Sequence, residues 1–226
     1  MDRLAGSPWS TPATVAGFAQ SQPNATLIGF ATAELEAHRG TRALDIGCGA
    51  ARNTVPLAAL GWAVLGIDLS TPMVAAAVQR ARADAPAQHL QFAIAPMDRI
   101  PALSGSFDLI VAHGIWNLAA SSAEFRRGVR EAARVARPGA GLFVFTFSRN
   151  TLPPEAQPVP GEAFVYTQFS GTPQCFVTER QLLSEMAAAG FLLEPGGPLV
   201  EHNRRPPGVF QSSGPVIYEG IFRYRG

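Results

Sequence analysis

Continuous apolar runs alternate along this chain with segments in which apolar residues recur every three or four positions. The continuous runs predict strands that are buried on both faces, and they lie at 43–46, 62–68, 90–94, 107–112 and 142–147. The segments with helical spacing lie between these runs, at 52–60, 71–84 and 121–135. Five strands that alternate with helices indicate an α/β fold built on a doubly wound parallel sheet.

The last third of the chain adds one helix and two strands to this pattern. A Thr-x-x-Gln capping box at Thr178 opens a helix that ends at Gly190. Apolar runs at 191–193 and 216–222 supply two more strands, which we expect to pair antiparallel at one edge. The prediction is therefore a seven-stranded, mostly parallel sheet with an antiparallel edge strand and helices on both faces.

Three segments fall outside this regular pattern. Residues 1–39 form an arm of prolines and aromatics followed by a helix that Asn24 can cap, and this arm either covers a pocket as a lid or only packs. Residues 148–177 and 195–215 are rich in proline and too long for plain connectors. We expect a single domain over 1–226 with these two loops on the substrate side.

Composition and charge narrow the class of protein. The chain has 226 residues, of which 47% are hydrophobic and 15% charged, as in a soluble globular domain. The net charge of +1 leaves no basic stripe, so we expect neither a nucleic acid nor a membrane surface as partner. The chain shows no signal pattern and no apolar stretch of about 18 residues, so a cytoplasmic location is expected. Cys48 and Cys175 suit neither a disulfide framework nor a metal cluster.

The first strand runs into a turn with two glycines, Gly47 and Gly49. Such a turn lets a ligand approach the backbone closely and brings N–H groups and a helix N-terminus to one place, which suits a nucleoside cofactor. The dinucleotide fingerprint requires a third glycine where Arg52 stands, so a nicotinamide cofactor is disfavoured. No Gly-Lys-Ser/Thr follows, so a P-loop is excluded. A purely structural turn between strand and helix remains an alternative.

Asp68 ends the second strand, about 20 residues beyond the glycines. Nucleoside-binding folds place an acidic residue there to accept hydrogen bonds from ribose hydroxyls. A helix cap is the alternative role, although Ser70, Thr71 and Pro72 directly behind it can already cap the next helix.

The segment from Asp45 to Ala51 resembles the first motif of class I S-adenosylmethionine (SAM) methyltransferases, acidic-x-Gly-x-Gly-x-Gly. Ala51 stands where the third glycine is usual, a departure that the small size of alanine or a helix that begins there accommodates. The likeness covers roughly residues 40–195 and includes the Phe-Asp start of the fourth strand and the Arg-Pro-Gly before the fifth. It implies a Rossmann-like fold. Residues 49–53 are also similar to the tellurite-resistance and thiol branch of these enzymes, which would imply a small, soft nucleophile such as a thiolate.

The resemblance implies a set of cofactor contacts. Asp45 would hold the ammonium group of SAM, Arg52 its carboxylate unless it is solvated, and Asp98 the adenine amine unless it starts a short helix. Met97 would cover the adenine ring, and Cys48 is expected to be there for its small size rather than as a nucleophile. The full set is Asp45, Gly47, Cys48, Gly49, Arg52, Asp68, Leu69, Met97, Asp98 and His113.

Methyl transfer from SAM needs an aligned, partly desolvated nucleophile, and a base only if the acceptor arrives protonated. His113 is the candidate catalytic base at the end of the fourth strand, and lining the cofactor pocket is its alternative role. Trp9, Trp116 and Tyr166 are candidate aromatic contacts on the substrate side, each with ordinary packing as the alternative. His38, His89 and His202 have no motif around them, and surface or helix positions are expected.

The expected function is therefore methyl transfer from SAM to a small molecule, with S-adenosylhomocysteine as the product. The fourth strand is not followed by an Asn-Pro-Pro-Tyr-like tetrad, which argues against methylation of DNA or of glutamine. Two alternatives stay open: a catalytically inactive SAM-binding protein that acts as a sensor or partner subunit, and an NAD-dependent enzyme. No metal is expected, and the sequence leaves the oligomeric state undetermined.

Overall fold

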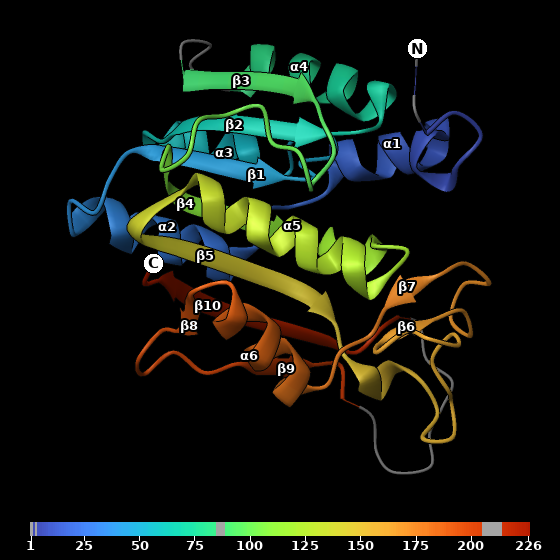
Figure 1. The fold of residues 1–226 in the computed structure, drawn as a ribbon. Coiled ribbons are helices and arrows are strands. Elements are labelled where there is room, and N and C mark those ends of the chain that lie inside the picture. Colours follow the sequence, from blue (N-terminus) through green and yellow to red (C-terminus); the bar gives the residue numbers. More distant parts are fainter. Residues whose placement is uncertain (1, 3, 85–88, 205–213) are drawn as a thin grey trace.

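The computed structural model describes residues 2, 4–84, 89–204 and 214–226. Its main sheet has the strand order β3-β2-β1-β4-β5-β10-β8, and an eighth strand, β9, pairs with β10 (Figure 1). The strands are β1 Arg42–Ile46, β2 Ala63–Asp68, β3 Leu90–Ile94, β4 Phe107–His113, β5 Ala136–Phe147, β8 Phe191–Leu193, β9 Val200–His202 and β10 Ile217–Tyr224. A separate hairpin joins β6 Val165–Tyr166 to β7 Gln174–Cys175.

Strands β1 to β5 run parallel, as expected for strands that alternate with helices. Strand β10 is antiparallel to β5, β8 and β9, so it is the one reversed strand of this sheet. Its pairing with β8 confirms the expected antiparallel pair of 191–193 with 216–222 at one edge, although the reversed strand itself lies between β5 and β8. The eighth strand, β9, is short and lies in the proline-rich segment 195–215. No apolar run in the sequence predicted it. Residues 205–213 of that loop lie outside the described residues.

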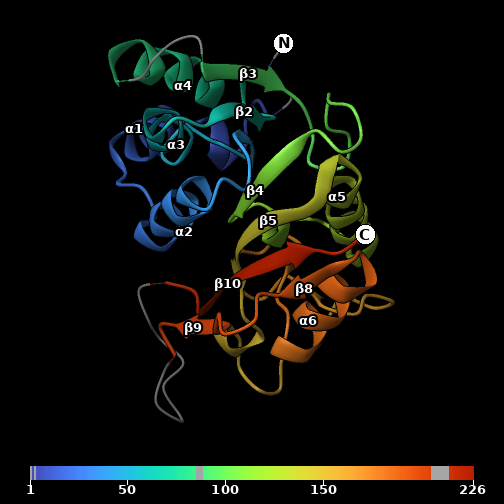
Figure 2. The ribbon, with the colours of Figure 1, turned by 90° about the vertical axis from the view of Figure 1, so that its left-hand side faces the viewer.

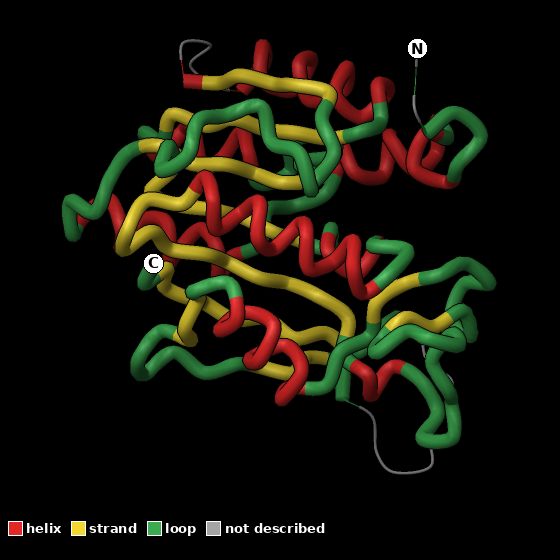
Figure 3. The backbone as a smooth tube through the Cα atoms, in the orientation of Figure 1, coloured by secondary structure: helices red, strands yellow, loops and turns green. Residues whose placement is uncertain are grey.

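Helices cover both faces of the sheet. Figure 2 shows α1, α2, α3 and α4 on one side and α5 and α6 on the other. The helices are α1 Pro12–Gln20, α2 Ala25–Glu36, α3 Thr54–Leu60, α4 Thr71–Asp84, α5 Ser122–Val135 and α6 Glu179–Ala188. The connection from β3 to β4 is a loop (Figure 3). None of the described helices is long and apolar enough to cross a lipid bilayer.

The two faces have separate apolar cores. Leu27 of α2, Leu57 of α3 and Phe143 of β5 are fully buried on one face. Phe125 of α5 and Met186 of α6 are fully buried on the other. Because side chains alternate along a strand, Leu109 and Val111 of β4 and Phe143 and Phe145 of β5 face α2 and α3. This alternation decides which polar side chains meet at the site described below.

The predicted helix caps are present. The Asn24 Oδ1 atom accepts a hydrogen bond from the Leu27 N–H at 2.9 Å, and Thr178 and Gln181 form the reciprocal capping box of α6. Loop 148–177 is held in place by Arg149, whose guanidinium donates to four backbone carbonyls within residues 152–156. These hydrogen bonds fix the conformation of the loop at the end of β5.

Candidate functional site

The carboxyl ends of β1, β2 and β4 meet at one edge of the sheet, on the right of Figure 1. Ligands of open α/β sheets bind in the crevice outside this edge. The glycine turn after β1, Asp68 at the end of β2 and His113 at the end of β4 all lie there. We therefore take this edge as the candidate functional site.

Three residues of the turn have left-handed backbone conformations: Gly47 (φ +70°), Gly49 (φ +52°) and Ala51 (φ +61°). A Cβ atom on Gly47 would lie 2.7 Å from the side chain of Ile115, so this position has no room for a side chain. Ala51 adopts the conformation that favours glycine, which explains why a third glycine is usual there. The helix does not begin at Ala51, as one explanation of the alanine supposed, but at Thr54.

The N–H groups of the turn are used within the protein. Gly47 and Cys48 donate to the Ile67 carbonyl at 2.8 and 2.9 Å, and Gly49 donates to the Asp68 Oδ2 atom at 2.9 Å. The expectation that these N–H groups face a ligand is therefore wrong for these three residues. The glycines instead allow a ligand to lie close to the backbone. Polar contacts to a cofactor must then come from side chains.

The Asp68 carboxylate links the end of β2 to the glycine turn and to the start of α4. Its Oδ2 accepts from Gly49, and its Oδ1 accepts from the Ser70 N–H at 2.8 Å. Ser70 caps α4 through its hydroxyl, which accepts from the Met73 N–H at 3.3 Å, as predicted. Each carboxylate oxygen retains a second lone pair for a ribose hydroxyl, and Leu69 lies in the bend directly after Asp68. Burial raises the pKa of Asp68.

Asp45 is almost fully buried, and its Oδ2 accepts a hydrogen bond from the Thr54 hydroxyl at 2.6 Å. Burial raises the pKa of Asp45 to about 7, against the opposing effects of this hydrogen bond and of the positive charge on Arg52. A carboxyl group with such a pKa gains most from a neighbouring cation, because the cation favours its ionised form.

Arg52 and His113 form a pair at the centre of the site. An Nη2 atom of Arg52 lies 2.8 Å from the His113 Nδ1 atom, and the His113 ring stacks on Phe145 with 4.1 Å between ring centroids. Burial, assisted by the charge of Arg52, lowers the pKa of His113 to about 3. The ring is therefore neutral near pH 7 and a very weak base, so the expected catalytic role of His113 is not supported and lining the pocket is the better account. Arg52 points into the site rather than into solvent.

We expect His113→Asn to weaken the binding of the cofactor by about tenfold, the effect of losing one hydrogen bond to a charged group that positions Arg52. The shape of the pH–rate profile above pH 5 should stay the same, because a group with a pKa of about 3 does not titrate there. Steady-state rates between pH 5 and 9 measure this. If the pH–rate profile of the wild-type protein falls off at one end of this range and that of the variant does not, His113 exchanges protons during the reaction.

Met97 and Asp98 follow β3, as expected of a loop that holds a base. The Asp98 Oδ2 atom accepts from the Arg127 Nε at 3.1 Å, and a quarter of the Asp98 side chain is exposed. Residues 97–98 form a turn, so the alternative that Asp98 starts a short helix is wrong. Met97 lies over Gly128 of α5, close to Trp116.

The N-terminal arm covers the glycine turn. The Trp9 carbonyl accepts from the Ser70 hydroxyl at 3.3 Å, and its ring meets that of Phe18 edge-on. The Phe18 ring lies 3.4 Å from the place where a Cβ atom of Gly49 would be, and the Arg52 guanidinium lies over the same ring at 6.0 Å. Of the three aromatic residues predicted for the site, Trp9 is thus the one that the arm brings to it.

Trp116 and Tyr166 have packing roles. Trp116 is 1% exposed and packs against Phe125 within the core. Tyr166 is buried in the β6–β7 hairpin, where its hydroxyl accepts from the Arg149 Nε at 3.1 Å and its ring lies under the same guanidinium. Both rings are enclosed by protein, which favours the packing alternative for these two residues.

Cys48 is buried in the turn, and burial raises the pKa of its thiol. A thiol that resists ionisation is a poor nucleophile, which agrees with its expected role as a small residue. Among the described residues, no group of three or more His, Cys, Asp and Glu side chains is placed to hold a metal ion.

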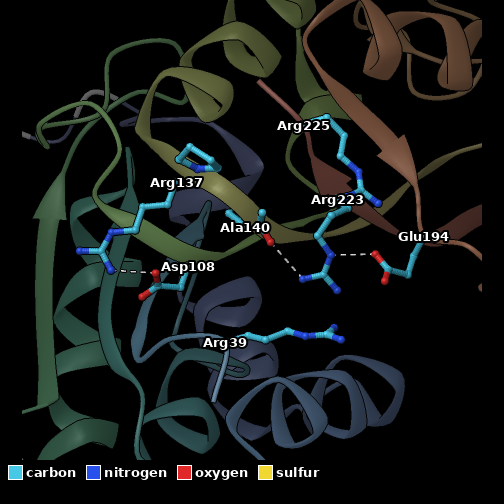
Figure 4. Close-up of a pocket in the computed structure, with 9 residues that line it drawn as sticks. Arg39, Asp108, Arg137, Ala140, Glu194, Arg223 and Arg225 are labelled. Carbon is cyan, nitrogen blue, oxygen red and sulfur yellow. Dashed lines mark hydrogen bonds and ion pairs between the residues drawn. The ribbon is translucent and has the colours of Figure 1, made fainter. Parts of the chain in front are cut away.

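A cavity of about 430 Å³ lies at the opposite, amino edge of the sheet (Figure 4). Its charged residues are largely paired with one another: Arg137 with Asp108 at 2.7 Å, and Arg223 with Glu194 at 2.7 Å. Asp108 also accepts from the backbone N–H groups of Thr41 and Arg42 at the start of β1. These contacts tie strand ends and loops together, so we assign this edge a structural role.

Sequence reasoning missed three polar residues at the carboxyl edge. Glu219 is buried on β10, where Asn24 donates to its Oε2 atom at 2.7 Å and His202 contacts its Oε1 atom at 3.3 Å. A glutamate inside the apolar run 216–222 was the signal that pointed to a buried polar contact. The roles of His202 and Asn24 depend on β9 and on the approach of α2, which the sequence pattern does not specify.

Comparisons with known proteins agree with one another. The family described as "Methyltransferase domain" matches residues 43–139. A demethylmenaquinone methyltransferase of Mycolicibacterium vanbaalenii is 30% identical over 166 residues, which make up 66% of this chain and 68% of that protein. One from Beutenbergia cavernae is 36% identical over 115 residues, 50% of this chain and 44% of that protein. The chain spans about half the length of several curated relatives that it matches.

The fold is also found in solved structures. A 1,6-didemethyltoxoflavin-N1-methyltransferase of Burkholderia thailandensis, crystallised with 1,6-didemethyltoxoflavin and S-adenosylhomocysteine, superposes with a TM-score of 0.62. The two chains are 19% identical, and the match covers 88% of this chain and 78% of that one. At this identity the comparison concerns the fold.

Proposed function

Because the chain belongs to the class I SAM-dependent methyltransferases, we propose that it transfers a methyl group from SAM to a small-molecule acceptor. One observation carries the proposal: three aspartates lie at the same edge of three neighbouring strands, where Gly47 has no room for a side chain. Asp45 is the next-to-last residue of β1, Asp68 ends β2, and Asp98 follows β3. In SAM the ammonium group, the ribose and the adenine amine are each suited to a carboxylate partner.

We assign the individual contacts in the same order along the edge. Asp45 accepts from the ammonium group, Asp68 from the ribose hydroxyls and Asp98 from the adenine amine, with Met97 and Leu69 beside the ring. Arg52, held by His113, carries the positive charge for the carboxylate of SAM. Gly47, Cys48 and Gly49 allow the cofactor to lie against the backbone.

The arm and the loops complete the proposed site as parts of one catalytic domain. Phe18 and Trp9 lie over the glycine turn, so we assign residues 1–39 the role of a lid over the cofactor. Loop 148–177 follows the end of β5, and residues 200–202 pair with β10 at the same edge. We assign loops 148–177 and 195–215 to the acceptor. When bound, SAM supplies an activated methyl group, and the protein aligns the acceptor behind it and keeps water out.

The acceptor is proposed to be a small molecule that carries its reacting proton. The relatives named above are demethylmenaquinone methyltransferases, and a ring that is methylated on carbon, oxygen or nitrogen releases a proton. The weak net charge of +1 favours such a molecule over a nucleic acid. A cytoplasmic location is part of the proposal.

Calorimetric titration with SAM and S-adenosylhomocysteine tests the cofactor, with NADH as the control ligand. We expect micromolar binding of the two adenosyl compounds and no binding of NADH. Turnover is then measured with a panel of thiols, phenols and hydroquinones. Binding of NADH alone would contradict the proposal, and SAM binding without turnover of any acceptor would leave a SAM-binding protein instead of an enzyme.

A further inference from the structure

A chain of hydrogen bonds leads from the glycine turn to the far side of the candidate site. The Asn53 Oδ1 atom accepts from the Asn24 N–H at 3.0 Å. The Asn24 Nδ2 atom donates to the Glu219 Oε2 at 2.7 Å, and the Glu219 Oε1 lies 3.3 Å from the His202 Nε2. This chain connects residue 53, beside Arg52, to β9 at the carboxyl edge, and the cofactor contacts proposed above do not use it.

Glu219 is a buried carboxylate in need of a positive charge. Its side chain is 7% exposed, and among the described residues no arginine forms an ion pair with it. Burial of an ionised carboxylate is costly unless a partner charge stabilises it. His202 is the group that can supply this charge, by taking up a proton.

Glu219 and His202 face the same side of the sheet as His113. Glu219 lies opposite Phe145, and Phe145 lies opposite His113 in the strand register. Paired residues on neighbouring strands project to the same face, so His113, Phe145 and Glu219 form one row across three strands. Neighbouring strands are about 4.8 Å apart, which places Glu219 about 10 Å from His113 along this row.

The row runs across the sheet from the end of β4, at the proposed cofactor site, to β10. Phe145 is partly exposed and lies between the cofactor end at His113 and the carboxylate at Glu219. His202 lies on β9 opposite Ile217 of β10, so it is diagonal to Glu219 on the neighbouring strand. Its side chain is 44% exposed. With its Nε2 atom bonded to the carboxylate, the Nδ1 atom of His202 makes no hydrogen bond among the described residues and is free to contact a ligand.

We propose that His202 accepts the proton that the acceptor loses on methylation, and that Glu219 is the positioning residue that holds and stabilises its ring. The proposal rests on the proposed methyl transfer. As the acceptor atom forms its bond to the methyl carbon, the S–CH₃ bond breaks, and its electron pair stays on sulfur as S-adenosylhomocysteine. The proton of the acceptor passes to the His202 Nδ1 atom, and the resulting imidazolium pairs with Glu219. Its exposed edge then releases the proton to water.

The surroundings separate this pair from other charges. On β9, Glu201 faces the opposite side of the sheet, where its Oε1 accepts from Ser148 and Asn150. Arg204 is 73% exposed and lies 3.6 Å from Glu201. The uncharged Asn24, which caps α2, contacts Glu219. In the same row, His113 is neutral because burial and the charge of Arg52 lower its pKa. Glu219 is thus the charged group in contact with His202 among the described residues.

Two acceptors of the same shape test the proton transfer. At pH 7.5 4-methylphenol is protonated, whereas 4-methylthiophenol is largely ionised and needs no base. We expect His202→Asn to lower kcat for the phenol by about a hundredfold or more, in the range of general-base catalysis, and to change kcat for the thiol by less than about threefold. His38→Asn is the matched control, because His38 is exposed at the end of α2 and has a left-handed backbone (φ +52°) that asparagine tolerates. Equal losses for both acceptors, or none for the phenol, would overturn the proposal.

Glu219→Gln tests the positioning role through a readout other than activity. The amide orientation of Asn24 is fixed, because its Oδ1 accepts from Leu27, so its Nδ2 can only donate to the oxygen of the new glutamine. The glutamine NH₂ group then faces His202 and donates to Nε2, which moves the imidazole proton to Nδ1. We expect ¹⁵N NMR, recorded at a pH at which the ring is neutral, to show the ring proton on Nε2 in the wild-type protein and on Nδ1 in the variant.

The outcomes separate this inference from the proposed function. An unchanged tautomer in Glu219→Gln would overturn the pairing whether or not an acceptor turns over. If the wild-type protein methylates both acceptors and His202→Asn retains full turnover of the phenol, the proton transfer is overturned and methyl transfer stands. Absence of SAM binding in calorimetry would instead remove the proposed function, and the inference with it.

Discussion

We expect Asp68→Ala to weaken the binding of SAM by about ten- to a hundredfold, because the proposed charge-assisted hydrogen bonds to the ribose would be lost. The substitution also removes the acceptor of the Gly49 and Ser70 N–H groups. The turn and the start of α4 then lose their common anchor, and a further loss of about 1–3 kcal/mol in the free energy of unfolding is expected from the unsatisfied donors. Calorimetry measures the first effect, and urea unfolding the second.

Asp68→Asn separates the two effects. The asparagine keeps one oxygen for the backbone and loses the charge, so we expect most of the loss in SAM affinity with a smaller loss of stability. Glu36→Gln, an exposed position on α2, is the control for the removal of one negative charge. Unchanged affinity in both Asp68 variants would withdraw the ribose assignment and leave Asp68 as a structural anchor.

Arg223→Met lowers the free energy of unfolding by about 3–5 kcal/mol, the cost of breaking a buried ion pair by removing one partner. The Arg223 guanidinium donates to both carboxylate oxygens of Glu34, at 2.6 and 3.0 Å, and to Glu194 at 2.7 Å. The side chains of Arg223 and Glu34 are only 6% and 3% exposed. The exposed Arg39, at 2.9 Å, is then left as the ion-pair partner of Glu34. Urea unfolding measures the loss.

Two further variants show where this energy comes from. Arg225→Met removes a neighbouring arginine that forms no ion pair among the described residues, and we expect a change within about 0.5 kcal/mol. Glu34→Leu combined with Arg223→Met removes both buried charges and should recover most of the stability. If the double variant is as unstable as Arg223→Met, the packing of the arginine stem, and not the charge, is what stabilises this edge.

The sequence predicted those parts of the site that depend on short-range pattern. The pattern of apolar runs that end in a turn predicted the positions of Gly47, Gly49 and Asp68. The structure has the ends of these strands where the pattern predicted them. The capping residues Asn24 and Thr178 were predicted for the same reason. A strand that is followed by a glycine turn and a helix leaves few alternatives for where its last side chains point.

The features that were missed depend on contacts between distant segments. The state of His113 is set by Arg52 and Phe145, which approach it from two other elements, so its low pKa has no local signal. The enclosure of Trp116 and Tyr166 likewise depends on how α5 and Arg149 pack over them. His202 gained a partner only because β10 inserts between β5 and β8 and brings Glu219 to it.

The inserted position of β10 also affects how the protein can fold during its synthesis. Strands β1 to β5 emerge from the ribosome first, but the free edge of β5 is covered only by β10, whose residues 217–224 come late in the chain. Until then β5 offers an unpaired edge to other chains. We therefore expect nascent chains that stop short of residue 224 to depend on chaperones, and ribosome-stalled intermediates to resist proteolysis only after β10 has left the exit tunnel.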